Sequence, residues 1–183
     1  MSGILPNEPN DTRVHVAQLL QEQVGAVRQR PISLDELSLD EGLVARDITG
    51  SARLTRIPTG ILAKGNLSAT VEQECIRCLE PFEQPVEAEF ADEYRPTIDI
   101  TTGAELTPNP EETDDDYFNI SDLHLIDLRE SLRQALVLEL PMAPLCREDC
   151  PGLPEAAGLS SEGDDRLAVL SRLLVNGDGD AHE

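Results

Sequence analysis

The chain has 183 residues, of which 39% are hydrophobic and only 3% aromatic, and its 36 acidic residues outweigh 14 basic ones to give a net charge of −22. This length suits one domain with appended segments, and its core must be built from aliphatic side chains. So negative a chain lacks the overall basic character of nucleic-acid-binding proteins; it suits a basic protein partner, or simply high solubility. No apolar run approaches the length of about 18 residues that a membrane-spanning helix needs, and the N-terminus does not resemble a secretory signal, so we expect a cytoplasmic protein.

The first predicted elements are weakly marked. Residues 1–12 are polar and rich in Pro and Asn, which predicts a flexible N-terminus. Residues 14–20 are typical of a strand end or a short helix, and Gly25 and Pro31 then interrupt the pattern.

From Leu43 onward the sequence is typical of β-structure. Apolar and polar residues alternate in patches over 43–57, 60–75 and 80–94, which predicts an antiparallel meander. Gly65 interrupts the alternation of the second segment and marks a β-bulge. Pro85 places the third segment at an edge of the sheet, because proline cannot donate a ladder hydrogen bond.

The second half of the chain begins with an acidic loop and then turns helical. Residues 99–116 are rich in Pro and acidic residues, which predicts a solvated loop, and 117–120 predict a short strand after it. An amphipathic helix follows, with Asp127 as N-cap, Glu130 reaching back to it, and Pro141 ending it. A second amphipathic helix is predicted over 164–175, before a tail. The fold class is α+β: a meander with two or three helices packed on it, an acidic loop and flexible termini.

The four cysteines are the candidate metal ligands. In a cytoplasmic protein they should be reduced, which favours metal or redox chemistry over disulfides. Cys75 and Cys78 have the C-x2-C spacing of half a zinc site, and Cys146 and Cys150 could complete a tetrahedron of thiolates. A redox-active dithiol at Cys75 and Cys78 is an alternative, although the pair follows a strand rather than opening a helix. The third alternative is four reduced cysteines that only fill turns.

Catalytic motifs are missing from the sequence. It contains no Gly-rich phosphate loop, no HExxH and no GxSxG, and its three histidines are scattered. We therefore predict that the protein is not an enzyme.

Several motifs together resemble one known family. They are CIRCLEP (75–81), LxLPMxPLC (138–146), CREDCxGL (146–153), DDRLAVLSRLL (164–174) and the opening VAQLL (16–20). In this order they are similar to the YceD family of large ribosomal RNA subunit accumulation proteins. The resemblance implies a chain divided into a flexible N-terminus (1–12), a YceD-like domain (13–150), and a linker, helix and tail (151–183).

The resemblance also implies a function. Family membership suggests a role in the synthesis, processing or stability of large-subunit (23S) ribosomal RNA, an α+β fold and no catalytic activity. Many members of the family continue past the second cysteine pair with two further cysteines, where this chain has Pro154 and Ala157. Either Cys146 and Cys150 bind a metal together with Cys75 and Cys78, or this copy has lost its metal. In the first case the sulfurs should lie about 4 Å apart around a zinc ion at about 2.3 Å.

Two kinds of partner follow from the charge pattern. Five acidic residues of the predicted loop could bind a basic ribosomal protein or the pre-ribosomal particle: Glu111, Glu112, Asp114, Asp115 and Asp116. Alternatively, Arg53, Arg56 and Lys64 could form a local cationic patch that binds RNA directly.

Overall fold

The computed structural model of the chain describes residues 11–40, 42–100, 102–106 and 117–153. Its elements are β1 (Arg13–His15), α1 (Ala17–Gln21), β2 (Val27–Ser38), β3 (Val44–Ile57), β4 (Gly60–Glu74), β5 (Pro81–Pro96), β6 (Phe118–Ile120), β7 (Leu125–Asp127) and α2 (Arg129–Glu139). The fold is α+β, as predicted, with a mostly antiparallel sheet and two helices in the described part. No helix among these residues is long and apolar enough to cross a membrane. Of the predicted flexible N-terminus (1–12), residues 1–10 lie outside the described residues, and Thr12 is buried; the predicted helix 164–175 also lies outside them.

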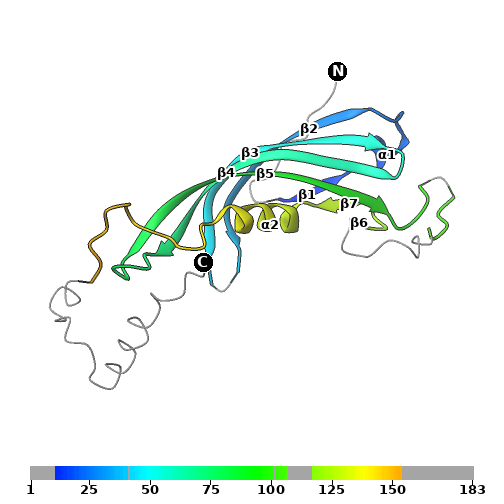
Figure 1. Cartoon of the computed structure of the whole chain (residues 1–183). Helices are drawn as coiled ribbons and strands as arrows, with labels where there is room; N and C mark the ends of the chain where they lie inside the picture. Colours follow the sequence, from blue (N-terminus) through cyan, green and yellow to red (C-terminus); the bar gives the residue numbers. More distant parts are fainter. Residues whose placement is uncertain (1–10, 41, 101, 107–116, 154–183) are drawn as a thin grey trace, which may run out of the picture.

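A five-stranded sheet in the order β2-β3-β4-β5-β6 dominates the molecule. The first four strands follow one another as antiparallel neighbours. β6 is parallel to β5 and pairs only with Tyr94–Pro96, so most of β5, including Pro85, has one paired neighbour, as an edge position requires. Figure 1 shows a long, curved sheet with α2 and the separate β1–β7 pair on the same side.

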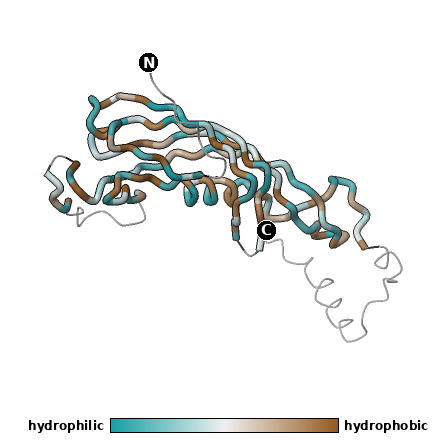
Figure 2. The backbone as a smooth tube through the Cα atoms, turned by 180° about the vertical axis from the view of Figure 1, so that it is seen from behind, coloured by the Kyte–Doolittle hydropathy of each residue, from teal (hydrophilic) through white to brown (hydrophobic). Residues whose placement is uncertain are grey.

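Alternation along the strands decides which face is buried. In β4, Ile61, Ala63, Leu67, Ala69 and Val71 are buried, and the residues between them are partly or fully exposed. The same two-residue period continues in β5, and Figure 2 shows the alternating colours along the strands. Leu132 and Leu136 of α2 and Leu19 and Leu20 of α1 join this inner face to close the core. We call the opposite side of the sheet the outer face.

Strand register corrects two sequence-based predictions. Gly65 is not a bulge: it pairs regularly with Ala52 and Phe90, and its missing side chain makes room for the Phe90 ring. The register shift lies instead between Arg46 and Thr49, where Asp47 has a positive φ of 53°. β2 was not predicted at all, because Pro31 interrupts its pattern; as the edge strand of the sheet it tolerates a proline.

The start of α2 also differs from its prediction. Leu128 occupies the N-cap position and makes no side-chain cap. Asp127 lies one residue earlier, where its carboxylate accepts hydrogen bonds from the Arg129 backbone N–H (2.9 Å) and the Thr12 hydroxyl (2.6 Å). Glu130 does not reach back: it binds the Arg133 guanidinium at 2.7 and 2.9 Å. The helix ends at Glu139, before Pro141, as predicted.

Candidate metal centre

Two loops carry the four cysteines, and the strand and helix before them decide where the loops begin. Cys75 follows the last residue of β4, and the turn to β5 is closed by hydrogen bonds from Leu79 N–H to Cys75 O (2.8 Å) and from Cys75 N–H to Glu80 O (3.0 Å). Cys146 and Cys150 lie in the segment 141–153 after α2. Figure 1 shows this segment running from α2 toward the end of the β4–β5 hairpin, where Cys75 and Cys78 lie.

The two loops contact each other through backbone and side-chain hydrogen bonds. The Ile76 backbone N–H donates to Pro144 O at 3.0 Å. The Arg77 guanidinium donates through Nη1 to Glu148 O (3.1 Å) and Cys150 O (3.2 Å). Segments some 70 residues apart in the sequence are therefore held side by side without a disulfide between their cysteines.

The sulfur atoms form a compact group of four. Cys75 Sγ lies 3.8 Å from Cys150 Sγ, and Cys78 Sγ lies 3.8 Å from Cys146 Sγ. All four sulfurs lie within 4.8 Å of one another. A disulfide would need about 2.05 Å, so the four thiols are free. Zinc–sulfur bonds of about 2.3 Å arranged tetrahedrally put the sulfurs about 3.8 Å apart, so the spacing fits a zinc ion.

Protonation differs sharply between the thiols. Hydrogen bonds from the backbone N–H groups of Cys146 and Cys78 lower the pKa of Cys75 to about 6, against the effect of its burial. Burial, together with the neighbouring thiols, raises the pKa of Cys146 to about 12. The lowered pKa of Cys75 favours the thiolate form, which is the form that binds a metal.

The burial of Cys75 and Cys150 favours metal binding over redox catalysis, whereas Cys78 is partly exposed and Cys146 is exposed. The thiol with the lowered pKa, Cys75, is 0% exposed, and Cys150 is 5% exposed, so neither presents a nucleophile to a substrate. Cys75 also follows a strand instead of opening a helix. Four thiolates with no open position are typical of a structural zinc site, and thiolates disfavour magnesium or calcium. A zinc ion held by Cys75, Cys78, Cys146 and Cys150 would join the β4–β5 turn to the segment after α2.

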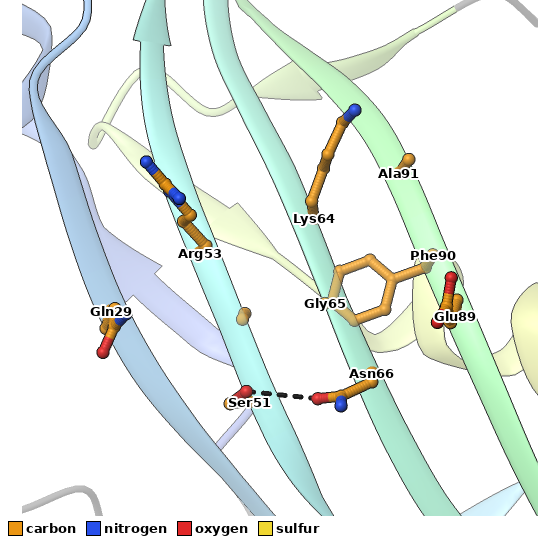
Figure 3. Close-up of a pocket in the computed structure, with 10 residues that line it drawn as sticks. Gln29, Ser51, Arg53, Lys64, Gly65, Asn66, Glu89, Phe90 and Ala91 are labelled. Atoms are coloured by element: carbon orange, nitrogen blue, oxygen red, sulfur yellow. Dashed lines mark hydrogen bonds between the residues drawn. The ribbon is translucent and has the colours of Figure 1, made fainter.

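The cationic residues proposed for RNA binding do not all come together. Arg53 and Lys64 are direct partners on neighbouring strands of the outer face, both are exposed, and neither has an ion pair within the described residues. They lie at a shallow depression of about 550 Å³ that Gln29, Ser51 and Asn66 also line. Figure 3 shows these side chains on their strands. Arg56 lies on the other face of β3, where its guanidinium donates to the backbone carbonyls of Leu20, Ile57 and Gly60. Arg56 therefore belongs to the fold.

The acidic residues proposed for partner binding, Glu111, Glu112 and Asp114 to Asp116, lie outside the described residues. A second acidic group, which the sequence analysis missed, lies on the outer face: Glu72 on β4 and Glu83, Glu87 and Glu89 on β5. We call these four residues the acidic strip. Glu72 and Glu83 are direct cross-strand partners. The signal was present in the sequence, because glutamates at 83, 87 and 89 share one parity of a strand.

Comparison with known proteins gives related sequences but no template for the fold. An uncharacterized protein of Mycobacterium tuberculosis is 31% identical over 129 residues, which are 70% of this chain and 56% of that protein. An uncharacterized protein of Mycobacterium leprae is 33% identical over 112 residues, covering 59% of this chain and 46% of its own length. The chain thus spans about half the length of these curated relatives. No solved structure is significantly similar to it.

Two further matches carry a functional name. A protein of Haemophilus influenzae named large ribosomal RNA subunit accumulation protein YceD is 33% identical over 85 residues, 46% of this chain and 45% of that protein. The family described as large ribosomal RNA subunit accumulation protein YceD matches residues 63–174, a range that holds both cysteine pairs. The chain therefore belongs to the YceD family of large ribosomal RNA subunit accumulation proteins.

Proposed function

We propose that the protein is a non-enzymatic factor that supports the synthesis, processing or accumulation of large-subunit (23S) ribosomal RNA by binding a basic protein of the assembling ribosome. Family membership supports the link to ribosomal RNA. The net charge of −22 supports a protein partner over the RNA itself, because phosphates would be repelled. The proposal assigns no catalytic step to the chain.

The observation that carries the proposal is the acidic strip on the outer face. Glu83, Glu87 and Glu89 are exposed, and none has an ion-pair partner among the residues that the structure describes. Glu72 has an ion pair with Arg46 at 3.8 Å. Both side chains are exposed to solvent, so this pair contributes little to stability. A row of unpaired carboxylates on a rigid sheet attracts a cationic partner and raises its rate of association.

A charge-matched binding experiment tests this proposal. The triple variant E83Q/E87Q/E89Q removes three charges from the acidic strip, and E36Q/D122N/E148Q removes three exposed charges elsewhere. With purified proteins of the large ribosomal subunit as the probe, we expect the first variant to lose at least about tenfold in affinity at low salt, since each lost charge pair costs a fraction of a kcal/mol or more. Equal affinities of the two variants would refute the role of the acidic strip.

The same experiment includes a variant of the acidic segment that was predicted from the sequence to bind a partner. A variant with Glu111, Glu112, Asp114, Asp115 and Asp116 changed to amides tests whether that segment contributes to binding. Loss of binding in this variant alone would move the contact from the sheet to the segment.

Direct RNA binding is a second candidate function, favoured by one observation. Arg53 and Lys64 are paired across neighbouring strands (Figure 3), and the hydroxyl of Ser51 and the amides of Gln29 and Asn66 line the same depression. Glu89 lines the same depression, however, and opposes a phosphate. If RNA binds here, R53Q/K64Q weakens binding of a 23S fragment and lowers the slope of log affinity against log salt by about 1.4 to 1.8. An unchanged slope would remove this candidate.

A further inference from the structure

Four-thiolate centres usually depend on the metal to hold distant ligands together, but in this chain the protein already does so. The sulfurs of Cys75 and Cys150 come from positions 75 apart in the sequence, and they stand 3.8 Å apart at the spacing that zinc requires. Two backbone N–H groups join the two loops: Ile76 N–H donates to Pro144 O at 3.0 Å, and Cys146 N–H donates to the Cys75 sulfur. Both contacts lie four or more residues before Cys150, whose own amide bonds within its loop to Arg147 O at 3.2 Å.

Arg77 supplies the missing contacts at that end of the loop. Its side chain starts between Cys75 and Cys78 and reaches the opposite loop, where the same nitrogen, Nη1, binds Glu148 O at 3.1 Å and Cys150 O at 3.2 Å. A guanidinium in an acidic protein normally pairs with carboxylates, and Arg147 nearby does so with Asp149 at 3.5 Å. Arg77 donates to backbone carbonyls instead, which fixes the path of the chain at a metal ligand.

The second loop is shaped to pass close to Arg77. Gly152 has a positive φ of 84°, and a Cβ built on it would stand 3.4 Å from Arg77 O. The loop therefore turns directly after Cys150, next to the backbone of the residue whose side chain holds it. Charge adds to this arrangement, because four thiolates around a divalent cation leave a net charge of −2, which a neighbouring guanidinium offsets.

We propose that Arg77 is a positioning residue that holds the two cysteine loops in metal-binding geometry before the metal arrives. The proposal rests on the assignment of Cys75, Cys78, Cys146 and Cys150 as a zinc centre. Arg77 binds no metal itself; its two hydrogen bonds replace an ordering step that the metal would otherwise have to drive. Its positive charge alone does not account for the role, because Arg147 brings the same charge to the same loops.

Three variants separate these contributions. R77L removes the hydrogen bonds and the charge. R77K keeps the charge on a side chain that ends one bond short of the Nη1 position, and R147L removes a charge from the neighbouring position. Zinc affinity is measured by competition with a chromophoric chelator. We expect R77L to bind zinc about 10- to 100-fold more weakly, as is typical when a residue that orients a ligand is lost, and R77K to lose most of the same amount. R147L should stay within about threefold of the wild type.

A second measurement, on the metal-free protein, tests the positioning role of Arg77 separately from the assignment of the metal centre. The amide of Ile76, which bonds across the two loops, should exchange its hydrogen faster in R77L than in the wild type and R147L, with the amides of α2 unchanged as a check of folding. Wild-type protein that binds no zinc would overturn the metal centre, and the proposal with it. If the wild type binds zinc, and R77L and R147L lose zinc affinity equally while R77K loses none, Arg77 contributes only its charge. That result would overturn its positioning role. Zinc affinity and exchange in R77L equal to the wild type would overturn it as well.

Discussion

Tyr94 shows how a single residue connects several elements of this fold. It is 1% exposed, and its ring stacks on Phe118 of β6 with centroids 5.3 Å apart. Its hydroxyl lies 2.5 Å from Ser131 Oγ at the start of α2 and donates to Asp127 O at 3.3 Å. Burial raises the pKa of this phenol well above its ordinary value, although the hydrogen bond with Ser131 works in the other direction. One side chain thus ties β5 to β6 and to the helix.

This pKa shift predicts how stability changes in alkali. Above pH 10 the unfolded chain releases the Tyr94 proton while the folded protein retains it, so the folded state binds more protons and the free energy of unfolding falls as pH rises. Below pH 10 both states are protonated and the contribution is fully present. Removing this titration in Y94F should flatten the fall by up to about 1.4 kcal/mol per pH unit, measured by urea unfolding between pH 9 and 11.5.

Y117F is the matched control, because Tyr117 is only partly buried and its ring faces the Arg95 guanidinium at 4.3 Å. At pH 7 we expect Y94F to lose about 1 to 3 kcal/mol, since Ser131 Oγ is left buried without its partner. An alkaline slope in Y94F identical to that of the wild type would contradict the burial argument.

At the scale of elements, α2 draws its stability from one face. Leu132, Ala135 and Leu136 are buried against the sheet, and Arg133 on another side contacts Glu130 and Asp40. An 11-residue helix is marginal by itself in water, so packing must hold it in place. The same helix positions the segment that carries Cys146 and Cys150, which makes its packing relevant to the metal centre.

Two leucines of α2 give a direct test of this view. Leu136 is 0% exposed and Leu138 is 82% exposed, on the same helix and two residues apart. L136A should lower the free energy of unfolding by about 2 to 5 kcal/mol, because it removes buried methyl groups and leaves a cavity. L138A should change it by less than about 0.5 kcal/mol. Similar losses in chemical denaturation of the two variants would show that the helix does not pack as described.

At the scale of the whole molecule, the excess of negative charge lowers stability on the face that we propose binds a partner. Glu72 and Glu83 stand directly opposite each other on neighbouring strands, where like charges repel. This repulsion on the outer face adds to that of a chain with a net charge of −22. Repulsion of this kind is expected where a surface serves a cationic partner rather than the fold.

E83Q should therefore stabilise the protein while weakening partner binding. We expect a gain of about 0.2 to 1 kcal/mol in the free energy of unfolding at low salt, because the cross-strand repulsion disappears. The gain should shrink at 1 M salt, where the Debye length is about 3 Å. Thermal or urea unfolding at the two salt concentrations measures it, with D122N, at an exposed aspartate, as the control for one lost charge. A loss of stability in E83Q would show that Glu83 makes a favourable contact.

Much of the fold follows from local pattern. β3, β4 and β5 and the helix before Pro141 lie where alternation and amphipathic spacing predicted them, because each buries one face of its own sequence. β2 escaped prediction, since Pro31 breaks its pattern and only the pairing with β3 makes it a strand. Asp127 lies one residue before the N-cap position predicted for it. Its carboxylate accepts hydrogen bonds both from the first turn of α2 and from Thr12, which is distant in the sequence.

The amino-acid sequence by itself determined the family motifs, the acidic character and the identity of the four cysteines. Only the tertiary structure decided that Cys75 and Cys78 meet Cys146 and Cys150, that Arg53 and Lys64 share a face while Arg56 does not, and that four glutamates line up on the outer face. The physical reason is that local spacing sets the direction of each side chain within its own element. The path of the chain between distant elements follows from how they bury their apolar faces together.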